Sequence, residues 1–185
     1  MAVMEISDLE KRISELTDRV SAIEKSAGND RLAIGVMQGD LDSMIASFII
    51  ALGAVAYDIQ VDMFFTFWAI AALRDPNKSA KKSFMDRMFG LMLPRSSRAL
   101  PLSKMQMAGI GPKMIRGVMK QRGVKSLEEL IKEAGELGVR IHICEMSMNV
   151  MGFKEQEMID YPNLDYVGVG TFISLISESR QVLFF

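Results

Sequence analysis

The chain has 185 residues, 49% of them hydrophobic and 24% charged, and its 22 basic and 23 acidic side chains leave a net charge of −1. This balance is typical of a globular protein with one sizeable core and excludes a disordered chain. The small net charge provides no basic field for nonspecific nucleic-acid binding, so we expect no nucleic-acid partner, and it favours self-association.

The only cysteine cannot form an intrachain disulfide, which fits a reducing compartment, and we expect the protein in the cytoplasm. The first residues are partly acidic and lack the apolar region of a secretory signal. Residues 44–73 are the most apolar stretch, but Asp58, Gln60 and Asp62 divide it into pieces shorter than the roughly 20 residues of a membrane-spanning helix. We therefore expect no transmembrane segment.

Residues 1–27 contain a predicted helix with a heptad pattern. Its apolar residues alternate in steps of three and four, namely Ile6, Leu9, Ile13, Leu16, Val20 and Ile23. All three a positions are β-branched and two of the three d positions are leucine, a choice typical of a parallel coiled coil. The helix could pack on its own domain or on a second copy. The segment SAGND, residues 26–30, then ends it.

Residues 28–185 follow the rhythm of an α/β domain. Short apolar or β-branched runs predict strands at 32–37, 61–68, 139–144, 166–169 and 182–185. Between them, 41–56 has one broad apolar helical face behind a possible N-cap at Asp40, and Ser126 and Glu129 form a capping box for a helix that ends at Gly138. The sequence thus predicts a mainly parallel five-stranded sheet with helices on both faces.

Residues 76–122 interrupt this rhythm. They contain four prolines, a short amphipathic helix at 84–92 and the loop SKMQMAGIGPKMI. We expect a helical insertion after the second strand that covers the carboxyl edge of the sheet, where open α/β sheets place their sites.

Several chemistries are poorly supported by the sequence. The turn GVMQGDLDSM lacks the spacings of nucleotide-binding loops, and one His with one Cys cannot supply a zinc site, so we expect neither cofactor nor metal. No nucleophile-elbow motif supports a serine triad. The sixteen methionines are adaptable core and contact residues, with soft-metal or small-ligand binding by the Met-rich insertion as the alternative.

The segment ICEMSMNVMG places Cys144 at the end of a predicted central strand and before a helix start. A helix N-terminus there favours thiolate, whereas Glu145 opposes it, so a nearby cation is needed, for which Lys104, Lys113 and Lys154 are candidates. His142 faces the same side of the strand, but roughly 6.6 Å away, and we expect it to be structural. Cys144 is thus either a reactive thiol or a small buried residue.

Three segments together resemble the DsrE/DsrF-like family of sulfur-relay proteins, in the branch often labelled peroxiredoxin-like: GDLDSMIASFIIALGAVAYDIQVDMFFTFWAIAALR, SKMQMAGIGPKM and CEMSMNVMG. The resemblance covers residues 31–185. It implies a compact α/β fold, assembly into trimers or hexamers, and a strand-end cysteine, here Cys144, that carries sulfur as a persulfide. The N-terminal helix lies outside it.

The peroxiredoxin label does not fit, because HICEMSMN lacks the Thr and Pro of a peroxidatic site and the chain has no resolving cysteine. A persulfide relay needs one accessible thiolate. We therefore predict a sulfur carrier or sulfurtransferase-like protein that exchanges sulfur with TusA-like or rhodanese-like partners. The predicted surroundings of Cys144 are Thr66, Trp68, Lys104, Lys113, His142, Met146 and Met148. The alternative is a noncatalytic oligomeric scaffold with a buried Cys144.

Overall fold

The computed structural model describes residues 6–26 and 29–185. Five parallel strands form one sheet in the order β4-β3-β2-β1-β5, which confirms the predicted fold class. The strands are β1 (Asn29–Val36), β2 (Gln60–Phe65), β3 (Arg140–Cys144), β4 (Leu164–Val167) and β5 (Ser179–Phe184). The α-helices are α1 (Ile6–Ser26), α2 (Leu41–Val55), α3 (Phe84–Met92), α4 (Ile110–Gln121), α5 (Leu127–Glu136), α6 (Glu145–Val150) and α7 (Val169–Glu178).

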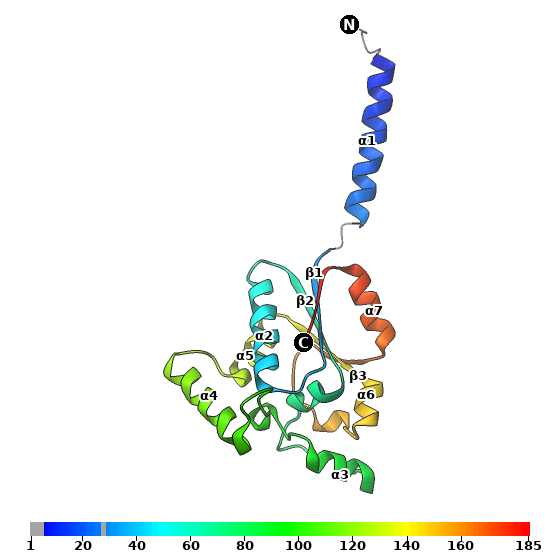
Figure 1. Cartoon of the computed structure of the whole chain (residues 1–185). Helices are drawn as coiled ribbons and strands as arrows, with labels where there is room; N and C mark the ends of the chain where they lie inside the picture. The colour runs from blue at the N-terminus through cyan, green and yellow to red at the C-terminus, as the bar shows by residue number, and fades with distance from the viewer. Residues whose placement is uncertain (1–5, 27–28) are drawn as a thin grey trace.

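Two helices cover one face of the sheet and one covers the other. The chain moves stepwise from β1 to β4 with α2 and α5 on one side, then returns past β1 to β5 through α7 on the opposite side (Figure 1). In α2 the buried residues recur at helical spacing: Leu41, Met44, Phe48 and Ala51. They meet Ile34, Met63 and Ile141 from the strands, and this is the main core.

The insertion lies at the carboxyl edge of the sheet (Figure 1). The backbone N–H of Leu41, the first residue of α2, donates to the carbonyl of Pro101 at 2.7 Å. The Asp42 carboxylate accepts hydrogen bonds from the backbone and hydroxyl of Ser103. The insertion is therefore attached to the end of the sheet where β1 leads into α2.

The structure corrects three details of the sequence interpretation. The predicted second strand ends at Phe65, before Phe67 with a φ of 47°, and residues 67–73 form the 3-10 helix η1. The predicted loop at 103–115 contains the start of α4, in which Pro112 occupies the first turn, where the N–H that proline lacks has no helical partner. Asp40 precedes α2, but its carboxylate accepts from the Ser43 hydroxyl and not from the helix backbone.

Helix α1 stands apart from the domain (Figure 1). The predicted heptad helix is present, and the apolar side chains described on its seam, Leu9, Ile13, Leu16 and Val20, are exposed. The predicted domain boundary at 27–28 lies outside the described residues. Among the described helices, none has the length and apolar content needed to cross a bilayer.

Candidate functional site at the carboxyl end of strand β3

Cys144 is the last residue of β3 and directly precedes α6. Its side chain lies on the sheet face that α7 covers, in a small cluster with Ala33, Phe64 and Phe172, and it is 2% exposed. Ile143, one residue earlier, belongs to the main core on the opposite face. The alternation of a strand thus separates the thiol from the main core and places it beneath α7.

Aromatic rings form much of the cluster around the thiol. Phe64 of β2 stacks on Phe172 of α7, with 4.4 Å between ring centroids and 9° between planes. Phe172 also meets Phe184 of β5 edge to face at 6.0 Å. Gly35 of β1 leaves room for this contact, because a Cβ there would lie 2.5 Å from the Phe184 ring. The environment of Cys144 is therefore apolar and closely packed.

A buried pair of hydroxyl groups connects the end of β2 to α6. The Thr66 Oγ1 and the Ser147 Oγ lie 2.6 Å apart and share a hydrogen bond. Ser147 lies three residues after Cys144 and is fully buried, and Thr66 is 9% exposed. A buried hydroxyl without a partner is costly, so this bond fixes the first turn of α6 against the sheet. Thr66 was predicted near the cysteine, whereas Ser147 was missed.

A charged cluster lies on the sheet face that α7 covers, toward the amino ends of the strands. The Asp62 carboxylate accepts hydrogen bonds from Arg140 at 2.9 Å and lies 3.4 Å from the Arg31 Nε. The His142 Nε2 lies 2.9 Å from the Asp62 Oδ1. Burial raises the pKa of Asp62, but hydrogen bonds and charge from His142 and Arg140 outweigh it and leave the pKa below its ordinary value.

The contact with Asp62 holds the His142 ring in place. Its Nδ1 is buried and makes no hydrogen bond within residues 6–26 and 29–185, the nearest carboxylate being Asp165 at 3.6 Å. Because Asp62 holds the Nε2, the imidazole belongs to the charged cluster. His142 lies two residues before Cys144 on the same face of β3.

The other residues predicted around Cys144 lie on several elements of the fold. Trp68 is 57% exposed and lines a cavity of about 350 Å³ with Gly39 and Leu93. Lys104 lies near Asp42, whose pKa it helps to lower, and Lys113 is exposed on α4.

Met146 is exposed, whereas Met148 packs in the main core. The Lys154 Nζ lies 3.9 Å from Asp86 of α3.

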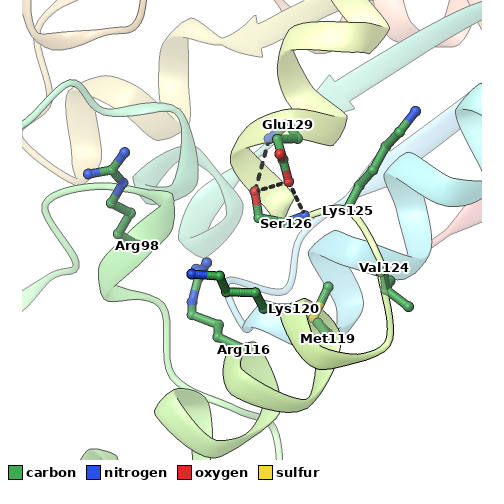
Figure 2. A pocket seen from close by; sticks show the side chains of 9 residues that line it. Arg98, Arg116, Met119, Lys120, Val124, Lys125, Ser126 and Glu129 are labelled. Carbon is green, nitrogen blue, oxygen red and sulfur yellow. Dashed lines mark hydrogen bonds between the residues drawn. The ribbon is translucent and has the colours of Figure 1, made fainter.

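A second cavity, of about 580 Å³, lies between α4 and α5 (Figure 2). Most of its charged side chains have partners: Arg116 binds Glu128 and the Ser97 carbonyl, and Lys125 binds Glu133. Ser126 and Glu129 form the predicted capping box, drawn as dashed lines in Figure 2. None of the nine residues that line it belongs to the Cys144 cluster.

Sequence reasoning missed Asp62, Phe64 and Phe172 as neighbours of the β3 end. Asp62 carried a signal, since it is a carboxylate inside a run of six strand residues of which five are buried. A charged residue at such a position needs a partner, and the strand register supplies one by setting Asp62 opposite Arg140. The partner could not be chosen without the strand order. Among the described residues, no group of three or more His, Cys, Asp or Glu side chains is arranged for a metal.

The protein is an α/β protein with an all-parallel sheet, and its cysteine lies at the carboxyl end of an inner strand. The family model described as DsrE/DsrF/DrsH-like matches residues 28–184, and the chain belongs to that family, as the sequence segments predicted. It is 43% identical over 155 residues to the uncharacterized protein YrkE of Bacillus subtilis, covering 83% of this chain and 96% of that protein. It is 30% identical over 164 residues to the sulfur carrier protein DsrE2 of Allochromatium vinosum, covering 83% and 97%.

Proposed function

We propose that the protein is a sulfur carrier in which Cys144 holds sulfane sulfur as a persulfide. The observation that carries the proposal is the position of the only cysteine, at the carboxyl end of β3 and the head of α6, in a chain of this family. The 30% identical relative named as a sulfur carrier supports the same reading. The protein acts in the cytoplasm and exchanges sulfur with other relay proteins of the TusA-like or rhodanese-like kind.

The transfer needs one thiolate and no external oxidant. The Cys144 Sγ attacks the outer sulfur of a donor persulfide, the S–S bond of the donor breaks, and the donor leaves as a thiol after taking up a proton. A new S–S bond then joins the outer sulfur to Sγ. Attack by an acceptor thiolate on that outer sulfur returns Cys144 to its thiol form. A single cysteine thus suffices for a relay, while a dithiol cycle would need a second.

Mass spectrometry after incubation with a persulfide donor tests the proposal. The wild-type protein should gain about 32 Da, the mass of one sulfur atom, and reductant should remove it. Cys144→Ala should gain nothing, and Ser147→Ala, which keeps the thiol, should still be modified. A wild-type spectrum identical to that of Cys144→Ala would show the proposal to be wrong.

Access to the thiol requires movement of the aromatic cluster, because Cys144 is 2% exposed and Phe172 packs in the same cluster. Phe172→Ala should therefore label with a thiol reagent faster than wild type. Ile173→Ala is the matched control, since Ile173 is the next residue of α7 and its side chain is exposed. Equal labelling rates for Phe172→Ala and Ile173→Ala would place the opening elsewhere.

A second candidate function is that of an oligomeric scaffold, and the exposed seam of α1 favours it. A helix of 21 residues with exposed Leu9, Ile13, Leu16 and Val20 lacks a partner surface within the described domain. A continuous apolar seam of this kind is typical of helices that associate with a second copy. Leu16→Glu should lower the sedimentation coefficient, whereas Ser14→Glu, off the seam, should not. If Cys144 also takes up no sulfur, the scaffold hypothesis replaces the proposed sulfur-carrier function.

A further inference from the structure

A cavity of about 460 Å³ lies at the carboxyl edge of the sheet, between α3 and the two segments that follow η1 and α6. Five cations line it, Arg74, Lys78, Lys82, Arg87 and Arg95, against two carboxylates, Asp75 and Glu157. Its size is that of a small-molecule site. None of its lining residues belongs to the Cys144 cluster.

Two of these cations are nine-tenths buried and share one carboxylate. The Arg74 and Lys82 side chains are 9% and 6% exposed. The Glu157 Oε1 lies 3.6 Å from the Arg74 Nη2, and its Oε2 lies 2.5 Å from the Lys82 Nζ. Two buried positive charges thus face one buried negative charge. Burying an unbalanced charge is costly, so the local arrangement is one negative charge short.

The remaining contacts of the pair do not supply that charge. The Arg74 Nη1 donates to the carbonyls of Pro94 at 2.8 Å and Gly90 at 3.4 Å, which satisfies its geometry but adds only dipoles. The Lys82 Nζ is buried and makes no hydrogen bond of acceptable geometry within the described residues. Both cations lie near the buried ring of Phe153, 5.0 and 5.6 Å from its centroid.

Gly90 leaves open the space where the two cations converge. A Cβ at this position would lie 3.4 Å from the Lys82 Nζ and 3.9 Å from the Arg74 Nη2. Gly90 lies inside α3, where glycine is less favourable than alanine, and its backbone has no positive φ that would require glycine. The absence of a side chain at Gly90 therefore leaves room beside the Lys82 ammonium group and the Arg74 guanidinium group.

The outer wall of the cavity adds positive charge. Arg87 and Arg95 are exposed, and no carboxylate within residues 6–26 and 29–185 pairs with either. Lys78 is held by Asp160 at 2.6 Å, and the Asp75 carboxylate accepts from Asn77. The pKa of Arg74 lies below its ordinary value, because burial and the nearby Arg95 lower it by more than Glu157 raises it. Arg95 is therefore near enough to Arg74 for the two like charges to repel each other.

We propose that this cavity binds a small dianionic oxyanion, such as phosphate, sulfate or thiosulfate, between Lys82, Arg74 and Arg95 beside Gly90. The anion supplies the missing negative charge and accepts hydrogen bonds from the Lys82 ammonium group. The inference does not depend on the function proposed for Cys144.

Thermal denaturation and calorimetric titration of the full chain test the site. Phosphate, sulfate and thiosulfate should each raise the unfolding temperature above that in chloride at equal ionic strength, and by more for the wild type than for Lys82→Met. Excluded anions stabilise both proteins, whereas an anion bound at the site stabilises only the folded wild type. Glycerol 3-phosphate separates two sources of the same chemistry: tighter binding than phosphate assigns the site to a larger phosphorylated ligand, and equal or weaker binding assigns it to the free ion. Equal unfolding temperatures in all these salts and in chloride would overturn the proposal.

Four variants test whether the anion binds at this site. Lys82→Met should weaken anion binding about tenfold or more, as expected for loss of a charge-assisted hydrogen bond, and it leaves Arg74 and Glu157 as a one-to-one pair. Lys81→Met, the exposed neighbour, is the matched control and should bind like wild type. Gly90→Ala should weaken binding without changing any charge. Arg95→Gln, at an exposed position, tests the outer wall if Lys82→Met fails to fold.

A purely structural role of Lys82 predicts a different result. If Lys82 serves only to anchor α3, Lys82→Met unfolds at lower temperature in every salt while its response to phosphate equals that of wild type, and the proposal is wrong. Cys144→Ala separates this site from the carrier function, because it should lose sulfur uptake and keep the full response to phosphate.

Discussion

The two faces of the sheet differ in construction, although the same strands supply both. On the α2 and α5 face the inward side chains are apolar, and two helices cover them. On the α7 face a single helix covers a small cluster with Cys144, and the amino ends of the strands carry Asp62, His142 and Arg140. The first face holds the protein together, which leaves the second free to carry polar and reactive groups.

Adjacent residues of β3 should show this difference most strongly. Ile143→Ala removes fully buried volume from the main core and should lower the free energy of unfolding by about 2–5 kcal/mol. Cys144→Ala removes one sulfur atom from the smaller cluster and should cost about 1 kcal/mol. Urea denaturation of the two variants measures the contrast, and equal losses would contradict it.

The charged cluster should be the main source of stability on the α7 face. Asp62→Asn leaves Arg31, Arg140 and His142 without their shared carboxylate and should cost about 3 kcal/mol, the lower end for a broken buried ion pair because Arg140 reaches solvent. Asp165→Asn is the control on the same face, and at this exposed position it should change stability by no more than about 0.5 kcal/mol. Chemical denaturation at pH 7 compares the two. A loss below about 1 kcal/mol for Asp62→Asn would mean that the cluster contributes little.

The hydroxyl pair between Thr66 and Ser147 should have a smaller effect. Ser147→Ala leaves the buried Thr66 hydroxyl without its partner and should cost about 1–3 kcal/mol. The double variant Thr66→Val/Ser147→Ala removes both polar groups and should recover part of that loss, as a double-mutant cycle measures. Strict additivity of the two single effects would show that the hydrogen bond carries no coupling.

Acid should weaken the α7 face through Asp62. Its folded-state pKa lies below the ordinary value, so its contribution to stability is complete above about pH 4 and is lost as the pH falls through the folded pKa. Asp42, Glu128 and Glu129 also have lowered pKa values and act in the same direction. Wild-type stability should therefore fall below about pH 4, and the fall should be shallower in Asp62→Asn. Parallel curves for both proteins would exclude this contribution.

Much of the architecture could be predicted because its signals are local. The apolar run VRIHIC after Gly138 predicted the strand that ends at Cys144, and Ser126 with Glu129 predicted the start of α5. Helix α4 was missed because Gly111, Pro112 and Gly117 are unfavourable to helices on average, whereas a proline in the first turn is tolerated. The end of β2 was misplaced because Phe67 and Trp68 have strand propensity but a tertiary turn begins there.

The sequence by itself determined the parallel α/β class, the heptad helix and the strand-end position of its only cysteine, since each depends on patterns within short segments. It also carried the family resemblance, through the similarity of three segments to that family. Only the tertiary structure decided that Cys144 clusters with Phe172 and that His142 contacts Asp62, 80 residues away along the chain. It alone also brought Arg74, Lys82 and Glu157 together. The physical reason is that these contacts follow from the strand order and the route of the insertion, which no local pattern specifies.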